Sequence, residues 1–317
     1  MLLFIVGLFT NNSARGVTVE TVFQLGETGT VFENLALRES GEILATRADV
    51  PEIWSIDPST KTGHKILTIP GAFAVMGIVQ VSIDVFYVNS GKYSVQSHDS
   101  GEGSWEIWKI DLAASQPRAS KLVSVPEAGL LNGMAKWDDN TILTVDSIGG
   151  RIYKVDLRTA KYEVAFSEDV PMKPLDRGLG INGIKVHDMF VYFTNTDRRL
   201  FYRTPVDTNL KPKGPAQLAL SGFRLDDFTI DHDGTIYIAT GKSNQILQYK
   251  LPGWVRRVAG WFDSVDLAGV TACEFGKSEH DEKLLYFSTS GTTFDQIEGA
   301  EPEPAKIAVI KFQEAKL

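Results

Sequence analysis

The chain has 317 residues, a formal net charge of −8, 43% hydrophobic residues and a mean hydropathy of −0.08. This composition is typical of a soluble globular protein, and the negative charge argues against nucleic acid as a partner, because phosphate binding requires a basic face. The only cysteine, Cys273, excludes an intrachain disulfide and most zinc sites built on thiolates. We expect Cys273 to be a small apolar residue inside a sheet.

Residues 1–16 are expected to form an N-terminal extension that precedes one domain over residues 17–317. The extension begins with an apolar run, Met1 to Phe9, which lacks a positively charged start and is far too short to span a bilayer. The sequence therefore favours a cytoplasmic location and predicts no membrane span, with secretion from a short, weak signal as the alternative.

One sequence motif, Ile-aromatic-X-Ile/Val-Asp, recurs along the chain in three clear copies and three weaker ones. The six copies are Glu52–Asp57, Glu106–Asp111, Arg151–Asp156, Leu200–Arg203, Gln245–Tyr249 and Lys306–Ile310. Each copy follows a second β-rich run bounded by Gly, Asp or Asn. These runs are Gly41–Thr46, Asp84–Val88, Asn140–Asp146, Met189–Thr194, Asp233–Thr240 and Lys283–Thr289. Strands this short and this regularly spaced predict repeated antiparallel units.

The repeats predict an all-β fold, a six-bladed β-propeller. Each unit is long enough for four strands and their turns, as in a propeller blade. The segment from Val17 to Leu25 alternates apolar and polar residues like an edge strand. We expect it to pair with Ile307 to Phe312 in the last blade, so that the ring closes without an open sheet edge. A β-sandwich is the rival architecture, and six copies of one motif disfavour it.

In a propeller, residues at the start of each innermost strand meet near one mouth of the central channel. Spaced 44 to 55 residues apart, the residues at this position are Glu33, Gly77, Asn132, Asn182, Asp226 and Thr271. Two carboxylates and two amide carbonyls that face a common point are suited to a hard divalent cation, Ca²⁺ before Mg²⁺ or Mn²⁺. Taken singly, each Asn-Gly or Asp-Asp pair also suits an ordinary turn.

These residues, together with Leu225–Gly234 and Thr271–Gly276, resemble the senescence-marker-protein/gluconolactonase family over essentially the whole chain. The resemblance implies that Glu33, Asn182 and Asp226 bind one divalent metal and that Asp226 is the general base for lactone hydrolysis. It also implies that Asn132 touches substrate or metal.

Two departures from the family pattern concern the pocket. Leu130 stands where the sugar-lactone hydrolases carry an arginine that holds a polar substrate, and Asp227 replaces the glycine that usually follows the catalytic aspartate. Adjacent residues of a strand point to opposite faces, so Asp227 is expected to leave the pocket. The expected apolar neighbours of the mouth, with Leu130, are Phe32, Met76, Leu131, Met134, Phe223 and Phe228. Packing between the blades is the alternative role for these side chains.

The five histidines are expected in turns or outer loops, which disfavours the histidine-dyad mechanism of paraoxonase-type propellers. The chain is also similar to short fungal propellers of natural-product pathways, some of which resemble hetero-Diels–Alderases. The features that carry this similarity are the opening Glu33–Arg38, the insertion from Tyr93 to Trp105, and Asp226–Phe228.

Three functions remain. The preferred hypothesis is a hetero-Diels–Alderase that joins an o-quinone methide, derived from a tropolone or polyketide, to a humulene-type terpene in an apolar pocket. Asp226, Asn182 and Asn132 would then be the catalytic polar groups, the partners would be apolar small molecules, and no cofactor would be required. The alternative is a Ca²⁺-dependent lactonase or esterase with Glu33, Asn182 and Asp226 as ligands. A propeller that only binds is the third hypothesis.

Overall fold

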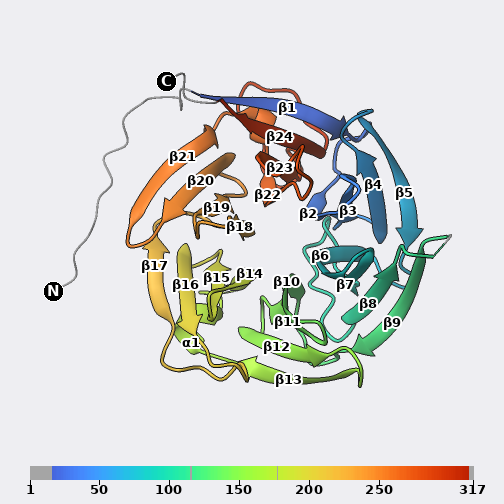
Figure 1. Ribbon diagram of the computed structural model, residues 1–317. Helices are drawn as coiled ribbons and strands as arrows, with labels where there is room; N and C mark the ends of the chain where they lie inside the picture. Colours follow the sequence, from blue (N-terminus) through green and yellow to red (C-terminus); the bar gives the residue numbers. More distant parts are fainter. Residues whose placement is uncertain (1–15, 115, 177, 314–317) are drawn as a thin grey trace.

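The computed structural model describes residues 16–114, 116–176 and 178–313 as six four-stranded antiparallel sheets arranged around a central channel (Figure 1). The predicted all-β, six-bladed propeller is confirmed. In every blade the innermost strand comes first in the chain and the strands follow outward in order, except that the last blade takes its outermost strand from the N-terminus.

Blade 1 consists of β2 (Phe32–Leu37), β3 (Ile43–Arg47), β4 (Glu52–Asp57) and β5 (Thr62–Thr68), and blade 2 of β6 (Ala74–Ser82), β7 (Val85–Gly91), β8 (Glu106–Asp111) and β9 (Arg118–Ser124). Blade 3 consists of β10 (Leu131–Asp138), β11 (Thr141–Asp146), β12 (Arg151–Asp156) and β13 (Lys161–Phe166), and blade 4 of β14 (Ile181–His187), β15 (Phe190–Asn195), β16 (Leu200–Pro205) and β17 (Gln217–Ser221). Blade 5 consists of β18 (Phe228–Ile230), β19 (Ile236–Ala239), β20 (Gln245–Lys250) and β21 (Trp254–Gly260), and blade 6 of β22 (Val270–Phe275), β23 (Leu284–Thr289), β24 (Lys306–Phe312) and β1 (Val17–Gln24). The helices are short: α1 (Asp169–Met172) and a 3-10 turn, Val265–Leu267.

The recurrent sequence motifs correspond to single strands of the blade. The Ile-aromatic motif is the third strand, as in β4, β8 and β12, and the β-rich run before it is the second strand, as in β3, β7 and β11. The second strands are almost wholly buried, whereas the outermost strands alternate between exposed and half-buried residues. This gradient arises because inner strands lie between two neighbouring blades and outer strands face water on one side.

The ring closes as the sequence predicts. β1 pairs antiparallel with β24, from Val17 opposite Phe312 to Gln24 opposite Lys306. The first and last parts of the chain thus share one sheet (Figure 1). Because the sheet of blade 6 contains both ends of the propeller, its hydrogen bonds hold the ring shut.

The axial residues lie in β-bulges. Strand register shifts between Phe32 and Asn34, which leaves Glu33 unpaired, and the same happens around Gly77, Asn132, Asn182 and Thr271. In blade 5 the backbone N–H of Asp226 donates to Ala239 O and that of Ala239 donates to Asp227 O, so two residues oppose one. A bulge redirects a side chain out of the pleat, and here the side chains of Glu33, Asn132, Asp226 and Thr271 reach the channel mouth.

Neighbouring blades are joined by hydrogen bonds to the carbonyls of these bulges. Thr46 Oγ1 donates to Met76 O at 2.6 Å, and Asn89 Nδ2 donates to Asn132 O at 2.6 Å. Thr194 Oγ1 donates to Asp226 O and Thr271 Oγ1 to Phe32 O, each at 2.8 Å. The remaining two junctions carry Ser147 Oγ to Ile181 O and the backbone N–H of Asp227 to Thr271 O. The bulges are therefore fixed relative to one another around the ring.

Residues 1–15, which carry most of the predicted extension 1–16, lie outside the described residues. In the part of the chain that is described, neither helix is long and apolar enough to cross a bilayer.

Replacing Gly133 with alanine is expected to destabilise the propeller. A Cβ there would lie 2.4 Å from Asn182 O in the next blade, so the blades would have to separate. We expect Gly133→Ala to lower the free energy of unfolding by about 1–3 kcal/mol. Gly26→Ala is the matched control, because a Cβ at Gly26 meets no atom within 4 Å. Denaturant unfolding measures both, and equal stabilities would contradict the argument.

Candidate functional site

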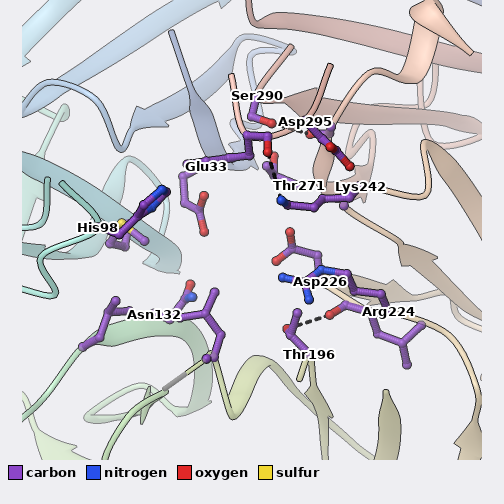
Figure 2. Close-up of a pocket in the computed structure, with 18 of the residues that line it drawn as sticks. Glu33, His98, Asn132, Thr196, Arg224, Asp226, Lys242, Thr271, Ser290 and Asp295 are labelled. Atoms are coloured by element: carbon purple, nitrogen blue, oxygen red, sulfur yellow. Dashed lines mark hydrogen bonds between the residues drawn. The ribbon is translucent and has the colours of Figure 1, made fainter. Parts of the chain in front are cut away.

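A cavity of about 320 Å³ occupies the channel mouth at which the inner strands begin. All six blades contribute to its lining through the axial residues and the loops around them (Figure 2). Its volume lies at the lower end of the range of roughly 300–1,000 Å³ for small-molecule sites.

Four of the predicted axial residues line this cavity: Glu33, Asn132, Asp226 and Thr271. Asn182 stands behind Asp226, and its Nδ2 donates to Asp226 Oδ1 at 2.8 Å and to Thr196 Oγ1 at 2.9 Å. The Thr196 hydroxyl donates its own proton to Leu225 O at 2.7 Å. Thr196 Oγ1 must therefore accept from Asn182, which fixes the orientation of the Asn182 amide.

Glu33 and Asp226 are carboxyl groups placed where ionisation is unfavourable. Burial raises the pKa of Glu33 well above its usual range, and the charges of Asp226 and Asp227 raise it further. Burial and the charge of Asp227 also raise the pKa of Asp226, to about 7, although Arg224 and the hydrogen bond from Asn182 oppose this rise. Near neutral pH the cavity floor therefore holds carboxylic acid as well as carboxylate.

Asp227 points away from the cavity, as predicted from its position directly after Asp226. Its Oδ2 accepts from Asn34 Nδ2 at 2.8 Å and lies 3.5 Å from Lys185 Nζ. Lys185 lines a second cavity, of about 260 Å³, formed by the distal halves of the inner strands. Asp227 thus belongs to the interior of the channel, between the two cavities.

Asn132 presents an unsatisfied donor. The residue is 2% exposed, and within the described residues its Nδ2 has no hydrogen-bond partner. A buried polar group without a partner costs about 1–3 kcal/mol. A ligand acceptor in the cavity would remove that cost, which makes Asn132 a strong candidate for substrate contact.

The apolar side of the cavity differs from the predicted one. Met76 and Leu130 line it as expected, but the other predicted residues do not. Phe32 packs against Phe23 and Trp54, Leu131 lies in the core beneath the mouth, and Met134 lines the second cavity. Phe228 packs edge-on against Phe201 at 4.9 Å between ring centroids, and the half-buried Phe223 joins the same cluster. Apart from Met134, these side chains pack between blades, the alternative role considered from the sequence.

Loops supply the remaining wall, which sequence reasoning did not assign residue by residue. The loop between β7 and β8 brings Tyr93, His98 and Ser100 to the cavity, and the loop between β23 and β24 brings Phe294 and Asp295. The aliphatic residues Ile148, Leu179 and Leu225 and the cationic residues Arg224 and Lys242 complete it. The long insertion from Tyr93 to Trp105 was the available signal, although His98 within it was expected in an outer loop, away from the site.

Of the three residues proposed as metal ligands, Glu33 and Asp226 contribute carboxylates that line the cavity. The Asn182 amide stands behind Asp226 and directs its nitrogen, not its oxygen, toward that carboxylate. A cation would also offset the repulsion that raises both carboxyl pKa values. Among the residues that the structure describes, no three His, Cys, Asp or Glu side chains lie close enough together to bind one metal ion.

The sequence is similar to two curated proteins. It is 25% identical over 293 residues to a "Putative hetero-Diels-Alderase" from Phoma sp, across 81% of this chain and 83% of the relative. A second protein of that designation, from Sarocladium schorii, is 25% identical over 301 residues, across 81% of this chain and 75% of the relative. No family model matches. The resemblance to hetero-Diels–Alderases that the sequence predicts is thus confirmed.

Solved structures share the fold. A luciferin-regenerating enzyme superposes with a TM-score of 0.69 at 15% identity, covering 93% of this chain and 95% of its own. A streptogramin B lyase gives 0.61 at 15% identity (95% and 100% covered), and a nutrient-binding protein from Bacteroides thetaiotaomicron gives 0.68 at 12% (94% and 77%). Because these neighbours include enzymes and a binding protein, the fold does not select among functions.

The raised pKa of Asp226 predicts how stability varies with pH. The folded protein keeps this proton up to about pH 7, whereas the unfolded chain loses it near 3.8. The folded state therefore binds more protons in this window, so the contribution of Asp226 to the free energy of unfolding falls as pH rises through it. We expect Asp226→Asn to flatten the dependence measured by urea unfolding with chelator present. The exposed Asp263→Asn should leave the slope unchanged, and an unaltered slope in Asp226→Asn would contradict the assignment.

Proposed function

We propose that this protein is an enzyme that catalyses an intermolecular hetero-Diels–Alder cycloaddition. Its substrates would be an o-quinone methide, whose C=C–C=O unit is the heterodiene, and an apolar alkene such as a humulene-type terpene. One C–C and one C–O bond form as three π bonds become one π and two σ bonds, so no atom leaves and no oxidant is needed. The designation of the two relatives supports this reaction class.

The observation that carries the proposal is the unpaired, buried Nδ2 of Asn132, a residue that lines a cavity with an apolar wall. Donation from this amide to the heterodiene carbonyl would withdraw electron density and make the diene more reactive toward an electron-rich alkene. Glu33 lines the same space, and its raised pKa keeps a second donor, the neutral carboxylic acid, close to the carbonyl.

Positioning supplies the other part of the catalysis. Two bound reactants in bonding geometry avoid the entropy loss of a bimolecular encounter, which is worth up to about 7–11 kcal/mol in well-oriented systems. The rigid ring suits this task, because hydrogen bonds between blades hold the bulges that carry Glu33, Asn132 and Asp226.

Lactone hydrolysis is the second candidate, favoured by the carboxyl groups of Glu33 and Asp226, which line one cavity. A divalent cation bound by these residues would polarise the lactone carbonyl. Asp226 would accept the proton of the attacking water. Against this candidate, Leu130 lines the cavity where a polar substrate would need a charged partner.

Asn132→Leu tests the proposed donor. The substitution preserves size but removes the amide, and the backbone carbonyl that accepts from Asn89 is retained. We expect kcat/KM for adduct formation from an o-quinone methide precursor and humulene to fall about 10- to 100-fold, with an unchanged melting temperature. Product is measured by chiral chromatography with mass detection. A rate equal to that of the wild type would remove Asn132 from the mechanism.

Calcium and chelator separate the two candidate functions. We expect EDTA to leave adduct formation within about twofold and lactone substrates to be stable, since hydrogen-bond donors on the protein activate the heterodiene. A stoichiometric metal by elemental analysis, with calcium-dependent lactone hydrolysis that Asp226→Asn abolishes, would instead establish the second candidate.

A further inference from the structure

Resting on the proposed function, we propose that the cavity contains two subsites. An aromatic subsite, formed by Tyr93, His98 and Phe294, would bind the planar heterodiene. An aliphatic subsite, formed by Leu130, Ile148, Leu179 and Leu225, would bind the alkene. The polar residues Glu33, Asn132 and Asp226 line the same cavity, where the new bonds would form.

The aromatic subsite is built by two long loops that flank blade 1. One loop joins β7 to β8 and the other joins β23 to β24, whereas the β3–β4 loop of blade 1 is short. The long loops therefore meet above Glu33, where the rings of His98 and Phe294 lie 6.4 Å apart between centroids at an interplanar angle of 36°. Tyr93, Phe294 and Leu179 all pack against the core cluster that includes Leu130, so the two subsites adjoin each other in the cavity.

Both loops are anchored, so the aromatic residues have fixed positions. Lys242 Nζ, from blade 5, donates to Phe294 O at 2.9 Å, and Thr293 Oγ1 donates to Thr30 O at 2.8 Å. In the other loop Trp105, fully buried, donates through Nε1 to Ser100 O at 3.1 Å. Flat side chains held in place favour a planar ring stacked in an offset arrangement over a bulky aliphatic molecule.

The aliphatic subsite lies on the opposite half of the ring. Leu130 and Ile148 come from blade 3, Leu179 precedes β14 of blade 4, and Leu225 precedes β18 of blade 5. Among the described residues that line the cavity, none on blades 3 to 5 is aromatic. Figure 2 shows His98 and Arg224 on opposite sides, with Glu33 and Asp226 between them. These branched side chains have no polar atoms and suit a hydrocarbon, while Arg224 and Lys242 supply the charged part of the same wall.

This division accounts for selectivity between two reactants in one cavity. A planar heterodiene in the aromatic subsite would place its carbonyl beside the amide of Asn132. The alkene, which lacks hydrogen-bonding groups, gains only from apolar contact and would occupy the aliphatic side. The two reactants would then approach each other across the floor of the cavity in one orientation.

Binding of two unreactive probes tests the division without relying on turnover. The probes are tropolone, a planar oxygenated ring, and α-humulene, an aliphatic macrocycle, which do not react with each other. Phe294→Leu removes the aromatic face but keeps the backbone carbonyl that accepts from Lys242. Ile148→Ala trims the aliphatic side at a residue that is 39% exposed, so folding is not at risk. Dissociation constants are measured by titration calorimetry, or by competition for poorly soluble humulene.

We expect Phe294→Leu to weaken tropolone binding about fivefold and to leave humulene binding within about twofold. Ile148→Ala should do the reverse, with about a fivefold loss for humulene. Phe73→Leu, at an aromatic residue 55% exposed outside the cavity lining, is the matched control and should change neither constant.

Parallel losses for both probes in either variant, or no loss in both, would overturn the division. Selective losses in a protein that forms no adduct would uphold the subsites and reject the proposed reaction. Adduct formation without selective losses would support the proposed reaction and reject the two subsites.

Discussion

The hydrogen bonds that pass from one blade to the carbonyl of the next inner strand are the constraint on which the site depends. Thr46, Asn89 and Thr194 each reach across a blade boundary to a bulge carbonyl. A bulge by itself leaves an unpaired residue with a carbonyl that must be satisfied. Here the neighbouring blade satisfies it, and the same contact sets the distance between axial side chains. Gly133 and Gly183 belong to this arrangement, because any Cβ would meet the next blade.

The chemistry of the cavity follows from the burial of two carboxyl groups, Glu33 and Asp226, which raises their pKa values. Glu33 and Asp226 face one space and Asp227 lies just below, yet Asp227 has Asn34 and Lys185 as partners. Burial, together with the charge of Asp227, shifts Glu33 and Asp226 toward the neutral acid. In the neutral form these carboxyl groups can donate hydrogen bonds to a substrate carbonyl, and in the ionised form they can bind a divalent cation. This ambiguity is why metal dependence separates the two candidate functions.

The apolar part of the site shows that loops, more than strands, adapt this fold to a ligand. Strand residues such as Phe32 and Phe228 are committed to packing between blades, which every propeller requires. The cavity wall instead uses Tyr93, His98 and Phe294 from loops that the blades hold in place. A rigid ring with variable loops allows neighbours of one fold to include a lyase and a nutrient-binding protein.

The sequence by itself determined the number of blades, the closing strand and the six axial positions. Residues that recur every 44 to 55 positions occupy equivalent positions in successive blades. Periodicity cannot say which face of the chain a side chain takes where a bulge interrupts the strand, nor how a 14-residue loop folds. Only the tertiary structure shows that the Asn182 nitrogen faces Asp226, that Met134 lines the second cavity and that His98 lies beside Phe294. Those placements depend on contacts between blades far apart in the chain, which a local pattern does not encode.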